Sequence, residues 1–240
     1  MDVKGFIDIS FVDWDSKISS VIFLPNCNFR CPFCHNVNLV LNPEKIETIP
    51  FEYVLDQLKK QKGWTDGVCI TGGEPTIHSS LPELLLKIKK MEFLVKLDTN
   101  GTNPIMLKEL IDRKLLDYVA MDIKAPLIAD KYSKATGINA ESLLKNVKDS
   151  IRLLMESGID YEFRTTVVPT VHDIGDIKQI CQSLKGCKKY VLQKFDVSIG
   201  KSVLDPKLKS KVLSEKEMQK FLSAAQEVIP SVKIRGIETK

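Results

Sequence analysis

Residues 18–36 read ISSVIFLPNCNFRCPFCHN, and this stretch decides the expected fold. Its first part, residues 18–24, is apolar and rich in β-branched side chains, which predicts a buried strand. The strand runs into a loop in which Cys27, Cys31 and Cys34 fall within eight residues. Because ligand sites of parallel α/β proteins form where strands end, this loop is the first candidate for a functional site.

Outward from this stretch, short apolar segments alternate with amphipathic ones. We expect strands at 5–12, 18–24, 67–70, 93–98, 117–122, 161–168 and 189–193, with a strand-like tail at 232–236. We expect helices at 51–61, from Pro82 onward, and at 104–113, 141–156, 174–184 and 215–228. Alternation of this kind predicts parallel strands with right-handed crossovers, after a first pair formed by 5–12 and 18–24. Periodicity does not separate a partial barrel from a doubly wound sheet.

The composition predicts one globular domain spanning residues 1–240. Apolar residues make up 43% of the 240 residues, and the net charge is only +4. The lysines are scattered among acids, so nucleic-acid binding is not expected. Neither a signal-peptide pattern nor an apolar run of about 18 residues occurs, so we expect a soluble cytoplasmic protein without a membrane span. In that compartment clustered cysteines more often bind metal than form disulfides.

Polar motifs follow the expected strands at corresponding positions. They are TGGEP at 71–75, DTNG at 98–101, Asp122 with Lys124, and the segment 164–166. Any one of them could be an ordinary turn. Together they predict a single site at the carboxyl ends of the strands.

The three clustered cysteines leave several metal chemistries open. Thiolates suit zinc and iron–sulfur clusters, and three ligands instead of four would leave one iron of a cubane open. Zinc with His35 as fourth ligand would require adjacent ligands at 34 and 35. The segment 31–35 also matches the C-x-x-C-H pattern of haem attachment, which leaves Cys27 unused. Simple burial is the common fate of cysteine, but Pro and Asn flank these three.

The pattern C-x3-C-x2-C, with an aromatic residue before the last cysteine, resembles the signature of the radical S-adenosylmethionine (SAM) superfamily. Gly72-Gly73-Glu74-Pro75 resembles the second motif of that family, and the likeness runs along nearly the whole chain. The resemblance implies a [4Fe–4S] cluster on Cys27, Cys31 and Cys34, with SAM on the open iron. It implies reductive cleavage of SAM to a 5′-deoxyadenosyl radical, with no catalytic residue beyond the cluster and SAM.

Further segments are similar to glycyl-radical enzyme activating enzymes. They are CHN at 34–36, LDTNG at 97–101, MDIK at 121–124 and RTTVVP at 164–169, and the opening 5–25 resembles the long form of the anaerobic ribonucleotide reductase activase. The resemblance implies a partial (β/α)6 TIM-like barrel with an N-terminal hairpin-like extension. It implies hydrogen abstraction from a backbone glycine of a partner enzyme, anaerobic ribonucleotide reductase above all. The implied electron donor is a reduced ferredoxin or flavodoxin.

The resemblance also assigns roles to individual residues. Those expected to contact the cluster-bound cofactor are Phe33, Cys34, His35, Gly72, Gly73, Glu74, Asp98, Asn100, Lys124 and Arg164. Asp98, Thr99 and Asp122, with the Ala120 carbonyl, match a monovalent-cation site, and Asp13 matches a residue on the substrate side. We expect Glu74 to act through hydrogen bonds rather than as an acid. Gly72 and Gly73 would let the backbone approach a ligand closely.

Two departures from the family pattern bear on the partner. Asp15-Ser16 stands where many relatives have Pro-Gly, and Phe195-Asp196 stands where one branch has a histidine. A radical SAM enzyme acting on a small molecule, an RNA or a peptide therefore stays an alternative, and a non-catalytic zinc or haem protein is a more distant one. Of the other candidates, we expect Cys69 in the core, Cys181 and Cys187 as free thiols, and His78 and His172 at surface or capping positions.

Overall fold

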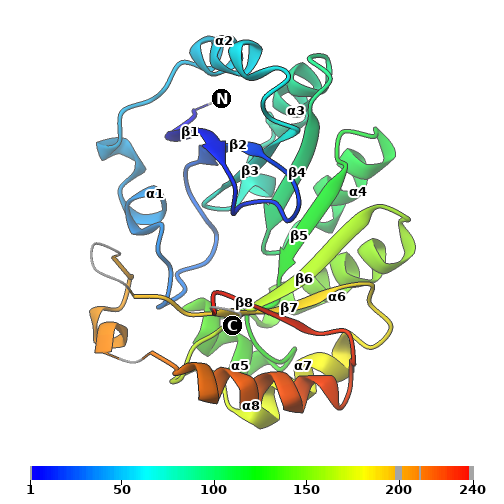
Figure 1. Ribbon diagram of the computed structural model, residues 1–240. Helices are drawn as coiled ribbons and strands as arrows, with labels where there is room; N and C mark the ends of the chain where they lie inside the picture. The colour runs from blue at the N-terminus through cyan, green and yellow to red at the C-terminus, as the bar shows by residue number, and fades with distance from the viewer. Residues whose placement is uncertain (1, 198–201, 211, 238–240) are drawn as a thin grey trace.

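A computed structural model describes residues 2–197, 202–210 and 212–237, and they form one curved sheet with helices around it (Figure 1). The strands are β1 (Gly5–Ser10), β2 (Ser19–Leu24), β3 (Gly67–Gly72), β4 (Leu94–Thr99), β5 (Tyr118–Asp122), β6 (Asp160–Val167), β7 (Tyr190–Lys194) and β8 (Lys233–Arg235). The helices are α1 (Val37–Leu41), α2 (Phe51–Gln61), α3 (Leu81–Lys89), α4 (Pro104–Asp112), α5 (Ala129–Thr136), α6 (Glu141–Glu156), α7 (Ile174–Ser183) and α8 (Glu215–Gln226).

The order of the strands decides between the two architectures that the sequence leaves open. The strands lie side by side in chain order from β1 to β8. Only β1 and β2 pair antiparallel, and every later neighbour is parallel. A doubly wound sheet would reverse its strand order at a switch point, and this sheet does not. The fold is therefore the expected partial barrel, built from the six β/α units that begin with β2 to β7, with β1 as the hairpin-like extension.

Most predicted elements are confirmed, and the misses are local. Pro82 lies in the first turn of α3, which begins one residue earlier, at Leu81. Two short helices, α1 and α5, occupy stretches for which the sequence predicts loops. The tail at 232–236 is a true strand, because β8 pairs with β7 in parallel. The irregular stretch expected at 195–213 lies partly outside the described residues.

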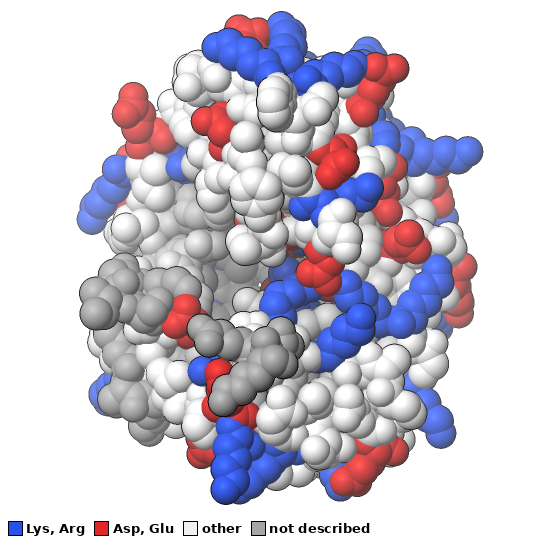
Figure 2. Space-filling model, viewed as in Figure 1, with Lys and Arg blue, Asp and Glu red and all other residues white. Residues whose placement is uncertain are grey.

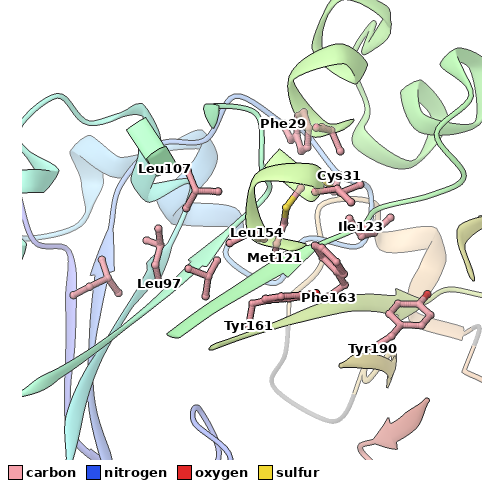
Figure 3. Packing of buried hydrophobic residues seen from close by; sticks show 14 of the residues in the cluster. Phe29, Cys31, Leu97, Leu107, Met121, Ile123, Leu154, Tyr161, Phe163 and Tyr190 are labelled. Atoms are coloured by element: carbon pink, nitrogen blue, oxygen red, sulfur yellow. The ribbon is translucent and has the colours of Figure 1, made fainter. Parts of the chain in front are cut away.

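Strand alternation separates an apolar outer face from a polar inner face. Leu97, Met121 and Phe163 belong to three neighbouring strands, are fully buried, and face the helices. Figure 3 shows them in the packing beside Leu107 of α4 and Leu154 of α6. Buried apolar contact of this kind stabilises the barrel wall. Since successive side chains point to opposite faces, the residues between them point into the barrel.

The residues on that inner face carry the polar chemistry. Lys96 and Asp98 of β4 alternate with Leu97, and Asp122 of β5 pairs in register with Arg164 of β6. Charged side chains in a barrel interior are rare unless they are paired or functional. The sheet therefore presents an ionic interior to the loops at its carboxyl end. Among the described residues, no helix has the length and apolar character needed to cross a membrane.

Candidate active site

A cavity of about 410 Å³ opens at the carboxyl ends of the strands. Its walls come from the cysteine loop after β2, from the ends of β3, β4 and β5 with the loops that follow them, from β6 itself, and from the end of β7. The predicted site residues that line it are Asp13, Cys27, Cys31, Phe33, Cys34, His35, Gly72, Gly73, Glu74, Asp98, Thr99, Asn100, Asp122, Lys124 and Arg164. The prediction that these motifs meet in one site is confirmed. The volume lies in the range of cofactor and small-molecule sites.

The three clustered thiols share this cavity. Cys31 is buried, Cys27 and Cys34 are half-buried, and all six cysteines, which fall within the described residues, are free. Burial raises the pKa of Cys27 to about 12 and that of Cys31 to about 11. Among the described residues, no three Cys, His, Asp or Glu side chains converge closely enough for a single metal ion.

Backbone hydrogen bonds hold the cysteine loop from two sides. The Arg30 amide donates to the Thr136 carbonyl at the end of α5 (2.8 Å), and the Glu74 amide donates to the Asn26 carbonyl (2.8 Å). Gly137 ends α5 with φ +68°, and a Cβ there would stand 2.1 Å from the Arg30 carbonyl oxygen. The unpredicted helix α5 therefore fixes the position of the cysteines.

Gly73 is the tightest contact between the GGEP loop and the cysteine loop. A Cβ added to it would lie 1.7 Å from the Asn26 carbonyl oxygen, a backbone atom that cannot yield. We expect Gly73→Ala to lower the free energy of unfolding by about 3 kcal/mol or to displace the loop, because overpacking against backbone is costly. Chemical denaturation measures the first effect.

A matched control is Gly63→Ala, where nothing lies within 4 Å and only the positive φ of 90° opposes a side chain. We expect that variant to lose only about 1 kcal/mol, the usual cost of one residue in a sparsely populated backbone region. Equal losses in the two variants would show that the contact with Asn26 is not tight.

Glu74 is fully used in hydrogen bonds. It is 1% exposed, and one carboxylate oxygen accepts bonds from the Thr76 amide, the Thr76 hydroxyl and the Thr99 hydroxyl (3.0, 2.6 and 2.7 Å). The other oxygen accepts from the Asn100 amide (2.6 Å). Burial raises its pKa, which these donors partly offset. The expected hydrogen-bonding role of Glu74 is confirmed, and its effect is to join the loops after β3 and β4.

An amide ladder extends this connection to the cysteines. The Asn100 side-chain amide donates to the side-chain oxygen Oδ1 of Asn28 (2.8 Å), and the Asn28 side-chain Nδ2 donates to the Thr102 hydroxyl (2.8 Å). The Phe29 amide donates to the Cys27 sulfur (3.3 Å). The cysteine loop and the loops after β3 and β4 therefore form one hydrogen-bonded unit.

An ionic network forms the wall opposite the cysteines. Arg164 donates to Asp122 (2.6 Å) and to Asp98 (3.3 Å), and Lys124 pairs with Asp122 (2.9 Å). Burial alone would raise the pKa of Asp122, but Arg164 and Lys124 hold it well below its ordinary value. Both carboxylates are therefore charged, and a guanidinium that bridges two acids has a fixed orientation.

Lys96 is a member of this network that sequence reasoning missed. Its ammonium group pairs with Asp98 and lies 3.6 Å from the Cys69 sulfur, and the residue is 2% exposed. Cys69 itself is buried as expected, yet it faces the barrel interior. A lysine two positions before Asp98 in an apolar strand is the signal that could have revealed it, because both lie on one face.

The residues of the expected cation site do not all point the same way. Asp98 and Asp122 share Arg164, whereas the Thr99 hydroxyl lies on the other side of β4 and donates to Glu74. The two carboxylates already pair with three side-chain cations, those of Lys96, Lys124 and Arg164.

Two histidines have roles that the sequence does not predict. His78 contacts the Pro25 carbonyl (2.8 Å) at the start of the cysteine loop. His172 is 4% exposed, so of the two expected positions, surface or capping, the surface position is wrong. Its Nδ1 accepts from the Val168 amide (3.0 Å), which leaves Nε2–H to donate to the Lys124 carbonyl (2.8 Å). His172 thereby anchors the backbone of a cavity residue.

The bonds of His172 require the neutral imidazole, and burial lowers its pKa below the ordinary value of 6.5. A lowered folded pKa means that the stabilisation is present above pH 6.5 and is lost as the pH falls through the folded pKa. We expect the free energy of unfolding to fall with a slope of up to about 1.4 kcal/mol per pH unit from this group. Urea denaturation at pH 7.5 and pH 5 measures it. His172→Gln should flatten this part of the profile, and an unchanged profile would contradict the assignment.

Comparison with known proteins fits this geometry. Residues 21–184 match the family described as the Radical SAM superfamily. The chain belongs to the radical SAM superfamily, and it is an enzyme of that class. This membership sets aside the alternative of a non-catalytic zinc or haem protein.

The relatives refine the class. A protein of Methanocaldococcus jannaschii, named as a glycyl-radical enzyme activating enzyme, is 35% identical over 98% of this chain and 96% of its own length. The pyruvate formate-lyase-activating enzyme of Clostridium pasteurianum is 27% identical over 85% of this chain and 88% of its own length. The chain is thus a homologue of glycyl-radical enzyme activating enzymes.

Solved structures support the fold. SuiB of Streptococcus suis, bound to S-adenosylmethionine, matches 91% of this chain with a TM-score of 0.64 at 13% identity. The chain spans 52% of the length of that SuiB chain. At this identity the likeness concerns the fold alone.

Proposed function

We propose that this enzyme holds a [4Fe–4S] cluster on Cys27, Cys31 and Cys34, binds SAM beside it, and generates a glycyl radical on a partner enzyme, most specifically an anaerobic ribonucleotide reductase. The observation that carries the proposal is the shared cavity: three free thiols of one loop open into the same space as the GGEP, DTNG and MDIK loops. Full-length likeness to activating enzymes supports the choice of partner class.

The thiols that line the cavity fit such a cofactor. Soft thiolates select iron–sulfur clusters, and three of them leave one iron position for a second ligand. Among the described residues, no three Cys, His, Asp or Glu side chains converge on one ion, so nothing there favours a mononuclear site. Because burial keeps the free thiols protonated, metal loading releases protons and favours higher pH.

The remaining residues bind and orient. Lys124, close to the Phe33 ring (6.0 Å), and Arg164 place positive charge where a carboxylate of the methionyl part would bind. The ring of His35 stacks on Phe195 (5.6 Å between centroids), and its Nε2 contacts the Asp196 carbonyl (2.7 Å). This pair forms an apolar platform that suits a flat base. When bound, the cluster supplies the electron that splits SAM.

Several finer parts belong to the same proposal. Asp13 lines the cavity wall, and we assign it to the side that would receive the protein substrate. A monovalent cation beside Asp98 and Asp122 would share their carboxylates with Arg164. Residues 1–240 act as one core domain in the cytoplasm, with a reduced ferredoxin or flavodoxin as electron donor.

The proposal is tested by anaerobic reconstitution with iron and sulfide, followed by reduction in the presence of SAM. We expect 5′-deoxyadenosine and methionine as products. Absence of both from a protein that has incorporated iron would overturn the proposed chemistry. A visible spectrum with broad iron–sulfur absorption, without a Soret band, confirms the loading.

The partner is tested separately. Electron paramagnetic resonance of the loaded enzyme with the anaerobic ribonucleotide reductase of the same organism should show a glycyl radical. SAM cleavage without that signal would exclude this partner and point to another protein, an RNA or a small molecule. A small-molecule substrate is a reasonable alternative because a protein of Pyrococcus horikoshii named as a GTP 3′,8-cyclase is 31% identical over 53% of this chain.

A further inference from the structure

A second ionic cluster closes the barrel at the end opposite the cavity. Glu162 is 2% exposed on the inner face of β6. It accepts two bonds from the Arg235 guanidinium (3.0 and 3.1 Å), one from Lys189 (2.9 Å) and one from the Tyr118 hydroxyl (3.2 Å). These residues lie at or near the amino-terminal ends of β5, β6 and β7 and on the short strand β8. We call this cluster the ionic floor.

Asp15 reaches the ionic floor from the other edge of the sheet. Its carboxylate accepts from Lys189 (2.7 Å) and from Arg235 (2.9 Å), which is 220 positions away in the sequence. Although burial would raise the pKa of Asp15, Lys189 and Arg235 hold it below its ordinary value. In Figure 1 the β1–β2 connection, in blue, and the strand β8, in red, lie on the same open side of the barrel. Asp15 therefore joins the two edges that the partial barrel leaves apart.

The residue beside Asp15 fills the space above this cluster. Trp14 is 6% exposed, and its ring packs against Tyr118 (5.8 Å between centroids). Gly67 makes room for it, since a Cβ there would lie 2.7 Å from the indole. Trp14 is thus packed inside the barrel and not exposed at its surface.

Asp13 precedes Trp14 and lines the cavity, on the side of the Trp14 ring that is away from the ionic floor. It accepts a hydrogen bond from Ser10. The three consecutive residues 13–15 thus connect the cavity wall to the ionic floor, and movement of Asp15 would be transmitted to Asp13 through Trp14. Figure 2 shows that basic side chains gather along one margin of the hollow on this face.

The backbone of this turn depends on the ion pairs. Ser16 has φ +62°, a left-handed conformation that glycine adopts without strain and serine does not. The ion pairs of the neighbouring Asp15 carboxylate with Lys189 and Arg235 restrict this turn. The unfavourable backbone conformation of Ser16 therefore lies beside the charge that the ionic floor receives.

We propose that Asp15 is a positioning residue: by pairing with Lys189 and Arg235 it holds Asp13 in the cavity wall for the protein substrate, and it plays no part in SAM cleavage. The inference rests on the proposed function, because it assumes a protein substrate on the Asp13 side. It gives Asp15 an indirect role that acts through Asp13, and it makes β8 a structural support of the substrate side of the cavity.

The test compares Asp15→Asn with Asp15→Glu and with Asp56→Asn, an exposed control whose own ion pair with Lys59 lies on α2. We expect Asp15→Asn to raise the KM for the anaerobic ribonucleotide reductase about tenfold, the scale of an ordinary coupling between sites. Substrate-independent formation of 5′-deoxyadenosine should not change. Asp15→Glu, which keeps the charge, should recover most of the loss, and Asp56→Asn should behave as wild type.

Two readouts separate positioning from general destabilisation. Hydrogen exchange should speed up at residues 10–16 and 232–235 in Asp15→Asn and stay unchanged at 27–36. The double variant Asp15→Asn with Arg235→Gln should be no worse in KM than the more affected single variant, because both break one cluster. Equal losses in SAM cleavage and partner activation, or a KM shift no larger than that of Asp56→Asn, would overturn the inference. If wild type does not cleave SAM, the proposed function fails instead, and the hydrogen-exchange result still tests the link from Asp15 to Asp13.

Discussion

Cys31→Ser is expected to abolish cluster loading. Cys31 is the middle one of the three proposed ligands and is buried in the cavity wall, so a hydroxyl there would replace a soft donor with a poor one. We expect most of the iron to be lost and SAM cleavage to fall by more than about a hundredfold. Iron and sulfide analysis after anaerobic reconstitution, together with the visible spectrum, measures the effect.

Cys187→Ala is the matched control for this loss. Cys187 is similarly buried but lies just past α7, on the helical side of the barrel. It should keep wild-type iron content. Retention of a full cluster by Cys31→Ser would contradict the assigned ligand set, and iron loss in both variants would indicate that the fold and not the ligand is affected.

Arg164→Met has the largest expected effect on stability. Arg164 bridges Asp98 and Asp122, and its side chain is 14% exposed. Removing it leaves two carboxylates facing each other across the barrel with Lys96 and Lys124 as their remaining cations. Breaking a buried pair on one side typically costs about 3–5 kcal/mol in the free energy of unfolding. Denaturant unfolding measures the loss.

Arg113→Met is the control, because Arg113 pairs with Glu109 on the exposed face of α4 and a surface pair contributes little. The variant Asp122→Asn with Arg164→Met should be more stable than Arg164→Met alone, since it removes one uncompensated charge. If Arg164→Met unfolds like wild type, the network does not stabilise the barrel.

The alternation of apolar strands and amphipathic helices in the sequence predicts the fold well. It fails for short elements, in which few apolar residues mark a buried face. Apolar strands such as 93–98 stand out because amphipathic helical segments follow them, and the helix 141–156 is long enough to show its apolar stripe. Helix α5 is missed because its sequence, ADKYSKAT, has one large apolar residue, Tyr132, to mark a buried face. Strand order is set by packing between elements, which no local pattern encodes.

The site residues likewise divide into those that the sequence predicts and those that only the tertiary structure reveals. The cysteine loop and the motifs after the strands can be predicted because each is a short, unusual run of residues. Lys96 and His172 escape because each is a single residue that contacts another element: Lys96 lies against the Cys69 sulfur of β3, and His172 bonds the Lys124 carbonyl after β5. The link between Asp15 and Arg235 joins the two ends of the chain, and its partners are apparent only once the sheet has curved.

The amide ladder between Asn28, Asn100 and Thr102 has a consequence for repair after exposure to air. These bonds, with those of Glu74, shape the cysteine loop through protein groups alone. Small zinc domains, by contrast, unfold when the metal leaves. We expect the metal-free enzyme to keep its folded state and to accept iron and sulfide again without refolding. Loss of the proposed cluster to oxygen would then be repaired by resupply of iron and sulfide, without synthesis of new protein.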